Sequence, residues 1–400
     1  MSSQLSSHTS QAATLKTPAI ILNHGYKLKR PLTTGTSATV YLASSTKFGN
    51  DIDVVCKWIR ACTKYTCPDK KNQWKIFFQK EALIMTRMAR HPHPNLMYAY
   101  DIFLVEASSI SNDDDCYNGC GQGFIMMPFM PNGTVAEEIY SSKEKQKSKS
   151  SIKMKIDPES QARIWFTDIM HALHWLHLNE IVHRDLKLEN CLLGPMKRVV
   201  VSDYGFSTSR EIGIETTFYA ETILGSLDHM APELVAMVIR LHEPDSEISV
   251  EKEPEVLAVG CQNYKVKPVD VYAAGVCLFE MLNYCPPFQP MNAVTQLEKE
   301  EIKNEQRLNK ESDQAAQKQL IYRIATELYN KQMIRDYKFD QLLKAPCEKL
   351  QQKNKNVQQE ERKASRMECI QMVNSCLAPN PTERPNTKQI LDSEWLQNDI

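Results

Sequence analysis

The segment His183–Asn190, with the sequence HRDLKLEN, contains the residues most able to do chemistry, and Asp203 follows thirteen residues after Asn190. Two carboxylates and an amide at this spacing fit a phosphoryl-transfer site that works through metal ions. In such a site Asp185 could orient a hydroxyl nucleophile, while Asn190 and Asp203 could hold Mg²⁺ against the phosphates of ATP. The spacing therefore predicts phosphoryl transfer that depends on ATP and Mg²⁺.

Upstream, two elements are expected to position a lysine and a glutamate. Val54, Val55 and Cys56 form an apolar run that ends in Lys57 and predicts a β-strand. The run 74–90 predicts a helix that contains Glu81, 24 residues after Lys57. Its expected apolar stripe consists of Ile76, Phe77, Leu83, Ile84 and Met88.

Three motifs downstream complete an ordered series. These are Ala231-Pro232-Glu233, the run 268–276 with Asp270, and the run 380–385 with Arg384. With them the chain resembles the eukaryotic protein kinases of Ser/Thr type over roughly residues 24–397. The resemblance implies that Asp270 is buried and that Arg384 pairs with Glu233.

This resemblance implies the α+β, two-lobed protein kinase fold. The N-lobe, about residues 24–127, is expected to be a small antiparallel β-sheet with one main helix. Residues 128–131 would link it to a mainly helical C-lobe at about 132–397. Residues 1–20 are expected to be a disordered tail because they are rich in Ser and Thr and lack periodicity.

The resemblance also assigns roles to single residues. Asp185, Lys187 and Asn190 would be catalytic, with Lys187 stabilising the transferred phosphoryl group and marking Ser/Thr specificity. Asn190 and Asp203 would bind Mg²⁺. Residues implied in ATP binding are Gly35, Val40, Val55, Lys57, Glu81, Met127, Met130, Leu192 and Asp203.

A regulatory site is expected in the segment from Asp203 to Glu233. Thr222 opens the run TILGS, which resembles the activation segments of the calcium/calmodulin-dependent and AMP-activated kinase groups. An upstream kinase or the chain itself would phosphorylate Thr222, and Arg184 would pair with the phosphate. Thr216, Thr217 and Tyr219 are lesser candidates. Leu227-Asp228-His229 departs from the family's usual P-x-Y, and the acidic Glu189 hints at basic residues upstream of the target hydroxyl.

The chain departs from the family pattern at several residues that are expected to lie near the bound nucleotide. The three positions of the glycine-rich loop are Thr33, Gly35 and Ala38, so one glycine of three remains. Val55 stands where the family usually has alanine, and Tyr204 replaces the phenylalanine of D-F-G. We expect these changes to raise the KM for ATP, and we expect the Tyr204 hydroxyl to need a partner.

Two other hypotheses stay open. A pseudokinase acting as a scaffold is suggested by the eroded glycine-rich loop, Val55 and long charged insertions. A small-molecule kinase on the related fold is less compatible with Ala231-Pro232-Glu233 and the Arg384 motif. The insertions are expected at 141–155, as a solvated loop, at 236–263 and at 291–366. Charged helical stretches at 297–320 and 348–366 would be solvated or would bind a partner.

Bulk properties exclude some classes of partner. A net charge of −1 gives no support for nucleic-acid binding, and Val271–Leu282 is too short and contains a glutamate, so no membrane span is expected. Without a signal peptide, the twelve cysteines predict free thiols in an intracellular, cytoplasmic protein that acts on other proteins. Cys191, Cys277 and Cys376 are expected in the core, and the pairs Cys62/Cys67 and Cys116/Cys120 are not expected to bind zinc.

Overall fold

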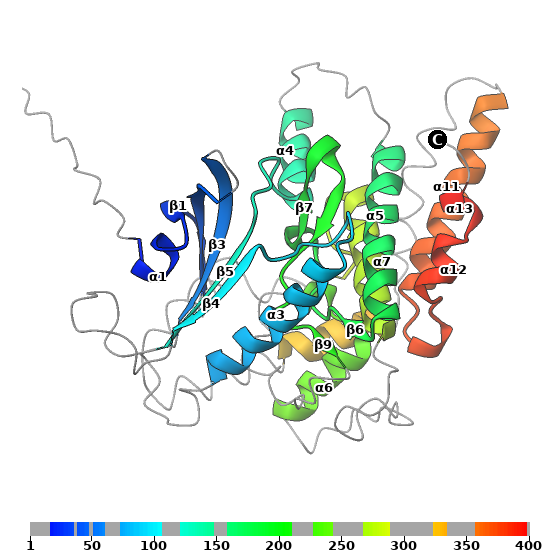
Figure 1. Cartoon of the computed structure of the whole chain (residues 1–400). Helices are drawn as coiled ribbons and strands as arrows, with labels where there is room; N and C mark the ends of the chain where they lie inside the picture. Colours follow the sequence, from blue (N-terminus) through cyan, green and yellow to red (C-terminus); the bar gives the residue numbers. More distant parts are fainter. Residues whose placement is uncertain are drawn as a thin grey trace, which may run out of the picture. The chain divides into compact units, whose positions relative to one another are not determined.

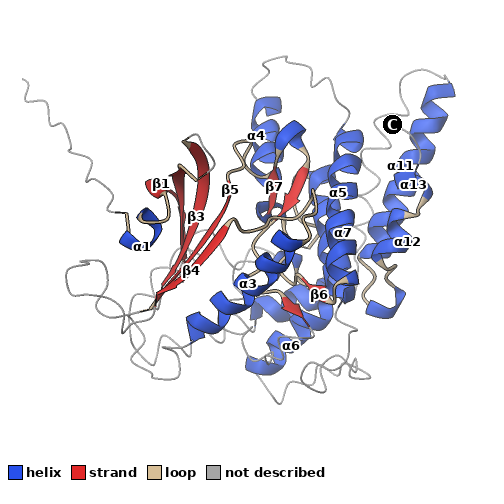
Figure 2. Cartoon of the chain, in the orientation of Figure 1, coloured by secondary structure: helices blue, strands red, loops and turns tan. Residues whose placement is uncertain are grey.

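The computed structural model describes residues 17–35, 38–47, 51–60, 73–105, 121–147, 158–209, 227–242, 267–288, 323–333 and 357–397. The chain divides into two compact units. Unit 1 comprises Met1–Pro92 and Met97–Phe129, and unit 2 comprises His93–Leu96 and Met130–Ile400. Figures 1 and 2 show their elements by position in the chain and by secondary structure.

Unit 1 is built on a five-stranded antiparallel sheet with the strand order β1-β2-β3-β5-β4. The sheet has one main helix, α3, and a short helix, α1, precedes the first strand. The elements are α1 (Ala19–Leu22), β1 (Tyr26–Thr34), β2 (Ala38–Ser45), β3 (Ile52–Arg60), α3 (Gln73–Arg90), β4 (Asp101–Val105) and β5 (Gln122–Pro128).

The two faces of this sheet carry different sets of residues, because successive side chains along a strand point to opposite faces. On one face, Val54, Cys56 and Trp58 of β3 join a buried cluster that includes Ile21 of α1. The opposite face carries Val55 and Lys57. The predicted strand ending in a lysine is therefore confirmed, and the alternation sends Lys57 away from the apolar cluster.

Helix α3 packs on the sheet through a face centred on Glu81. The predicted helix is confirmed, but its predicted stripe is wrong in part, because Ile76 and Leu83 are 40% and 52% exposed. At 3.6 residues per turn, Leu83 is rotated by about 200° from Glu81, whereas positions three, four and seven away stay close to it. The buried face is formed by Phe78, Glu81, Ile84, Met85 and Met88.

Unit 2 is mainly helical, with two small two-stranded sheets. Together with unit 1, this confirms the predicted α+β class. Its helices are α4 (Val135–Lys147), α5 (Pro158–Leu178), α6 (Pro232–His242), α7 (Lys267–Asn283), α11 (Val357–Cys376), α12 (Thr387–Leu391) and α13 (Glu394–Gln397), with a further helix at 323–333. The 3₁₀ turns are η2 (Leu188–Asn190), η3 (Pro195–Lys197), η5 (Leu227–His229) and η6 (Pro381–Glu383), and the strands are β6 (Ile181–Val182), β7 (Cys191–Leu193), β8 (Val199–Val201) and β9 (Thr208–Ser209).

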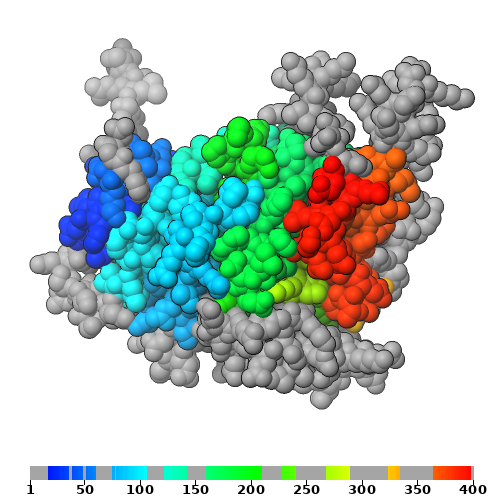
Figure 3. Space-filling view, turned by 45° about the vertical axis from the view of Figure 1, so that its right-hand side comes forward, coloured from blue at the N-terminus to red at the C-terminus, as the bar shows by residue number. Residues whose placement is uncertain are grey.

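Helices α5 and α7 form the centre of unit 2 and pack against each other. Every residue from Val269 to Leu282 is buried, so α7 is enclosed on all sides. No helix in the described ranges is long and apolar enough to cross a membrane. Cys191, Cys277 and Cys376 are buried as predicted, and burial raises the pKa of the Cys376 thiol to about 12. Figure 3 shows the C-terminal helices α11 to α13 gathered on one face of the unit.

Three predicted insertions contain regular structure. Residues 141–147 continue α4 instead of forming a loop, because a capping box between Thr134 and Glu137 starts a helix rich in Glu, Lys and Gln. Residues 236–242 belong to α6, whose Ala236, Val238 and Ile239 are buried. The helix 323–333 buries Ile324, Ala325 and Leu328.

Candidate active site

The catalytic-loop candidate, residues 183–190, is anchored by the buried Asp270 of α7. Its carboxylate accepts hydrogen bonds from the backbone N–H groups of His183 and Arg184, both at 2.8 Å, and His177 Nε2 lies at 2.9 Å. Arg184 has φ +66°, a left-handed conformation that costs a non-glycine residue about 1 kcal/mol. Asp270, predicted to be buried, thus stabilises the strained backbone directly before Asp185.

His183 is part of the core, as the sequence analysis predicted. Its Nδ1 accepts the backbone N–H of Asp185 at 3.3 Å, so its Nε2 carries the proton and donates to the Ser202 carbonyl at 3.1 Å. Its ring lies 5.5 Å from that of Tyr204, edge-on. The Tyr204 hydroxyl donates to the Val201 carbonyl at 2.7 Å, which confirms that it needs a partner.

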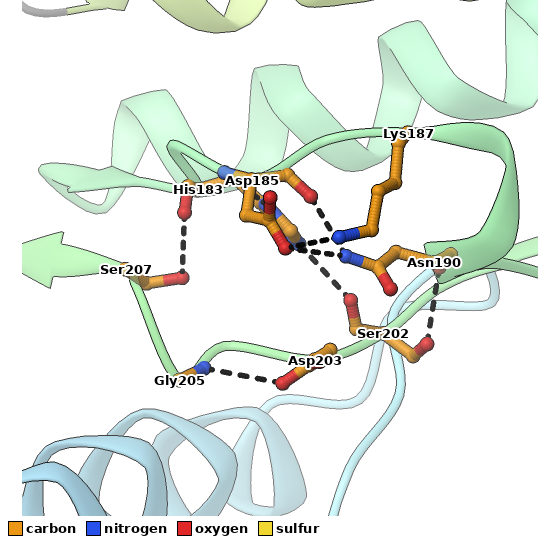
Figure 4. Close-up of polar contacts among 8 residues, drawn as sticks. All are labelled: His183, Asp185, Lys187, Asn190, Ser202, Asp203, Gly205 and Ser207. Carbon is orange, nitrogen blue, oxygen red and sulfur yellow. Dashed lines mark hydrogen bonds and ion pairs between the residues drawn. The ribbon is translucent and has the colours of Figure 1, made fainter. Parts of the chain in front are cut away.

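Asp185, Lys187 and Asn190 converge on one carboxylate oxygen (Figure 4). Lys187 Nζ lies 2.9 Å and Asn190 Nδ2 lies 3.1 Å from Asp185 Oδ2. Asn190 Nδ2 also donates to the Asp185 carbonyl at 2.7 Å. Because the amide nitrogen faces Asp185, the Asn190 side-chain oxygen is left as the atom that can ligate a cation.

Asp203 is tied to the same loop through its neighbour Ser202. Ser202 donates to the Asn190 carbonyl through both its N–H (2.9 Å) and its hydroxyl (3.0 Å). Asp203 itself has φ +66°, and its Oδ1 accepts the Gly205 N–H at 3.5 Å. Ser207 closes the far side by donating to the His183 carbonyl at 3.2 Å (Figure 4).

The oxygens of Asn190 and Asp203 fit Mg²⁺ chemically. Mg²⁺ prefers one or two protein carboxylate or amide oxygens together with substrate phosphates and water, rather than a complete protein cage. The part of the chain that the structure describes contains no cluster of three or more His, Cys, Asp or Glu side chains suited to a metal. The four cysteines weighed for zinc lie outside the described residues.

In unit 1 the structure brings five of the predicted ATP-binding residues to one side of the sheet. Register pairs Val40 with Lys57 and Val55 with Met127, so these four share the face opposite the apolar cluster. Lys57 Nζ lies 2.7 and 2.9 Å from the two carboxylate oxygens of Glu81. Both partners are largely buried, so the pair fixes the lysine on that face.

The remaining candidates are placed as follows. Gly35 lies in the β1–β2 turn and donates its N–H to the Ala38 carbonyl at 2.8 Å. In unit 2, Leu192 lies in β7 opposite Val200, and Met130 is the first residue of the segment Met130–Ile400. Arg184 Nε donates to the Phe206 carbonyl at 2.8 Å. Thr222, Thr216, Thr217 and Tyr219 lie outside the described residues, so their regulatory role stays a prediction.

The predicted pair of Arg384 and Glu233 is confirmed. It is bidentate, with N–O distances of 2.6 and 2.8 Å, and both residues are buried. Arg384 also donates to the carbonyl of Pro268, in the first turn of α7, at 3.1 Å. The pair therefore joins the start of α6 to the start of the helix that anchors the catalytic loop.

Comparison with known proteins decides the family. The protein kinase domain matches residues 26–249 and 252–396. The chain belongs to the protein kinase family.

Several curated relatives are serine/threonine kinases by name. The chain is 25% identical over 304 residues to serine/threonine-protein kinase max-2 of Caenorhabditis elegans, covering 74% of the chain and 36% of that protein. It is 25% identical over 270 residues to serine/threonine-protein kinase PrkC of Bacillus subtilis, covering 68% and 32%. It is 25% identical over 275 residues to CBL-interacting serine/threonine-protein kinase 20 of Arabidopsis thaliana, covering 69% and 48%. The chain thus spans a third to a half of the length of these relatives.

Three residues that stabilise the surroundings of this kinase's catalytic loop were not selected from the sequence. Ser202 and Ser207 flank Asp203-Tyr204-Gly205, and their hydroxyls bond to loop carbonyls. Asp168 of α5 is fully buried and accepts the Val199 N–H at 2.9 Å and Arg198 Nε at 2.8 Å, which fixes the start of β8. A usable signal existed for Asp168, because it stands among the apolar positions of its helix, where a carboxylate needs donors.

Proposed function

We propose that this kinase transfers the γ-phosphate of ATP to Ser or Thr hydroxyls of protein substrates. The observation that carries the proposal is the convergence of Lys187 and Asn190 on Asp185 Oδ2. Phosphoryl transfer needs positioned charges rather than covalent chemistry by the protein, and the charged groups it needs are all present in the sequence.

The residues divide the work. Asp185 would accept a hydrogen bond from the attacking hydroxyl and orient it, while Lys187 would stabilise charge on the transferred group. Asn190 and Asp203 would hold Mg²⁺, which neutralises phosphate charge when bound. Lys57, oriented by Glu81, would contact the α- and β-phosphates. Gly35, Val40, Val55, Met127, Met130 and Leu192 would bind the rest of the nucleotide.

Regulation and location are part of the same proposal. Phosphorylation of Thr222, by an upstream kinase or by the chain itself, would add a dianion that Arg184 can bind. The substrate would be a protein, and the cysteine content supports an intracellular location for the kinase. No separate observation favours a nucleic-acid or small-molecule substrate.

The test is ³²P transfer from ATP and Mg²⁺ to a mixed Ser/Thr peptide library. Wild type should label peptides, and Asp185→Ala should lose at least about a hundredfold in rate. Asp392→Ala, which removes an exposed carboxylate of unit 2, should match wild type. Absence of labelling by folded protein phosphorylated at Thr222 would favour the pseudokinase scaffold instead.

A further inference from the structure

Two buried arginines from different helices of unit 2 lie around the hydroxyl of Ser365 on α11. Arg163 of α5 is 9% exposed, and Arg366 of α11 is 5% exposed. Arg163 donates a hydrogen bond from Nη2 to Ser365 Oγ, and its guanidinium carbon lies 5.5 Å from the centre of the Trp395 ring on α13. These contacts join three helices at a place that the phosphoryl-transfer machinery does not use.

The carboxylate of Glu159, in the first turn of α5, contacts all three of these residues. Its Oε1 accepts the Ser365 hydroxyl at 2.8 Å and lies 3.9 Å from Arg163 Nη2, and its Oε2 lies 3.6 Å from Arg366 Nη1. The last distance is too long for a hydrogen bond, and Arg366 Nε is buried without a hydrogen-bond partner. The Arg366 guanidinium is therefore buried without a hydrogen-bonded acceptor among the described residues.

A phosphate on Ser365 would supply the missing acceptors. A buried guanidinium needs such acceptors, because an uncompensated buried charge is costly. Phosphoserine carries a charge of about −1.5 to −2 and three acceptor oxygens, and guanidinium groups bind phosphate through paired hydrogen bonds. The phosphate would repel Glu159, but that side chain is 14% exposed at the beginning of α5, where it can turn toward solvent. The two arginines would then share a dianion in place of one carboxylate.

The sequence before Ser365 agrees with the substrate preference that the catalytic loop suggests. Arg362 stands three residues before Ser365, and Lys363 stands two before it. Glu189, four residues after Asp185, is acidic and exposed, which favours basic residues upstream of the target hydroxyl. Ser365 therefore combines a suitable acceptor sequence with arginines that can bind the phosphorylated product.

We propose that this kinase phosphorylates its own Ser365, one molecule acting on another, and that Arg163 and Arg366 then bind the phosphate. The inference rests on the proposed function. Ser365 Oγ forms a bond to the γ-phosphorus of ATP while the bond from that phosphorus to the β–γ bridging oxygen breaks. ADP leaves, and the hydroxyl proton passes to Asp185 and then to solvent.

The first part of α11 must open for this reaction, because the half-buried Ser365 has to reach Asp185 of another molecule. The described apolar residues of α11 that are buried begin only at Cys369, after Ser365. Helix ends open locally at a lower free energy than the core of a protein. When α11 closes again, the phosphate comes to lie between the two arginines, so the modification should stabilise unit 2.

The first test maps the phosphate. Phosphatase-treated full-length protein is incubated with ATP and Mg²⁺, and the occupancy of each site is measured by peptide mass spectrometry. Ser375 is the matched control, because it lies exposed on the same helix and has no basic residue two or three positions upstream. We expect at least about ten times more phosphate on Ser365 than on Ser375, and about a tenfold loss at Ser365 in Arg362→Ala, which corresponds to one charged contact.

The source of the phosphate is tested with the inactive variant. Asp185→Ala alone should leave Ser365 unmodified. Asp185→Ala mixed with active Ser365→Ala should gain phosphate on Ser365, because one molecule acts on another.

Melting temperature then tests what binds the phosphate. Incubation with ATP and Mg²⁺, followed by removal of the nucleotide, should raise the Tm of wild type by about 2 °C, because Arg366 gains acceptors. Arg366→Gln should show less than half of this rise, and Ser365→Ala should show none. If circular dichroism shows that Arg366→Gln does not fold, the comparison of wild type with Ser365→Ala decides the matter.

Labelling of the Ser/Thr peptide library by the same preparations separates the possible failures. A wild type that labels the library but leaves Ser365 no more phosphorylated than Ser375 refutes the inference and leaves the proposed function intact. Phosphorylation of Ser365 that lowers Tm, or raises it equally in Arg366→Gln, also refutes the inference. A wild type that labels the library no better than Asp185→Ala refutes the proposed function and the inference with it.

Discussion

The catalytic loop at 183–190 and the β1–β2 turn at 33–38 were both expected to handle phosphate, yet they are held in different ways. In the loop, a strained backbone at Arg184 is fixed by the buried Asp270, and Asn190 and Ser202 bind its carbonyl groups. At the turn, Gly35 donates a backbone hydrogen bond to Ala38, and Thr33 and Thr34 of β1 pair with Val40 and Thr39 of β2. The kinase has kept its charged groups and their supports, whereas the glycine pattern of the turn has been reduced.

The difference indicates where substitutions should matter. Charges and their buried partners act in a low-dielectric setting, where losing one leaves another unsatisfied. Backbone freedom at a turn changes how closely a ligand can approach, which is a smaller effect. We therefore expect substitutions in the catalytic loop to lower activity much more than substitutions in the β1–β2 turn.

The largest effect is expected at the metal ligands. Asp203→Ala and Asn190→Ala should each lower kcat by about 10²- to 10⁴-fold, because developing phosphate charge is no longer neutralised. Rates measured over a range of Mg²⁺ concentrations check this. Partial rescue by high Mg²⁺ in Asn190→Ala would sharpen the assignment, and a rate independent of Asp203 would break it.

A large effect is also expected at Lys57. Lys57→Met should lower kcat/KM about a hundredfold and destabilise unit 1 by about 3 kcal/mol, because Glu81 is left as a buried, unpaired carboxylate. Adding Glu81→Gln should recover much of the stability but none of the activity. A double-mutant cycle by urea unfolding and peptide phosphorylation measures both; recovery of activity would contradict the role of Lys57.

Asp270 should show its effect through pH. Burial alone would raise the pKa of its carboxyl, but the hydrogen bond and charge of His177, the charge of His183 and the N–H of Arg184 outweigh burial, so the pKa is lowered. A lowered pKa stabilises the fold above the unfolded-state pKa, and this stability is lost as the pH falls through the folded-state value. Asp270→Asn should cost about 2–3 kcal/mol near pH 7.

Urea unfolding of wild type and Asp270→Asn from pH 7 down to pH 3 checks this. The difference in unfolding free energy should shrink as the pH falls. A difference that stays constant with pH would show that the carboxylate charge does not stabilise the catalytic loop.

Much of this architecture was predictable from the sequence because it depends on charged and amide residues at fixed spacings. Asp185, Asn190 and Asp203 were selected by their residue types and spacing, and the pairs Lys57–Glu81 and Arg384–Glu233 followed from the resemblance to the protein kinases. The phase of α3 was misjudged because exposed apolar residues, Ile76 and Leu83, resemble core residues in a sequence.

Other features depend on tertiary contacts that a single chain pattern does not reveal. Glu280 lies 140 residues from Tyr140 in the sequence, and Gln332 lies 102 residues from Met230, so no local pattern reveals either hydrogen bond. Residues 236–242 were assigned to an insertion because the acidic stretch after them dominated the composition. Burial of a polar group is predictable only when its donors are known.

The smallest effect is expected at the β1–β2 turn. Thr33→Gly with Ala38→Gly should lower the KM for ATP by about two- to fivefold, because the backbone can approach phosphate more closely, at a cost of about 0.5–1 kcal/mol of stability for each glycine. ATP titration of the peptide phosphorylation rate measures this. An unchanged KM for ATP would show that the reduced glycine pattern does not limit nucleotide binding.

The central claim is that Asp185 directs phosphoryl transfer to Ser and Thr. The most direct measurement is mass-spectrometric mapping of phosphate on a protein-derived peptide mixture after incubation with ATP and Mg²⁺, for wild type and for Asp185→Asn. We predict phosphoserine and phosphothreonine with wild type and almost none with Asp185→Asn. Equal phosphate incorporation by both proteins, or incorporation on tyrosine alone, would contradict the account.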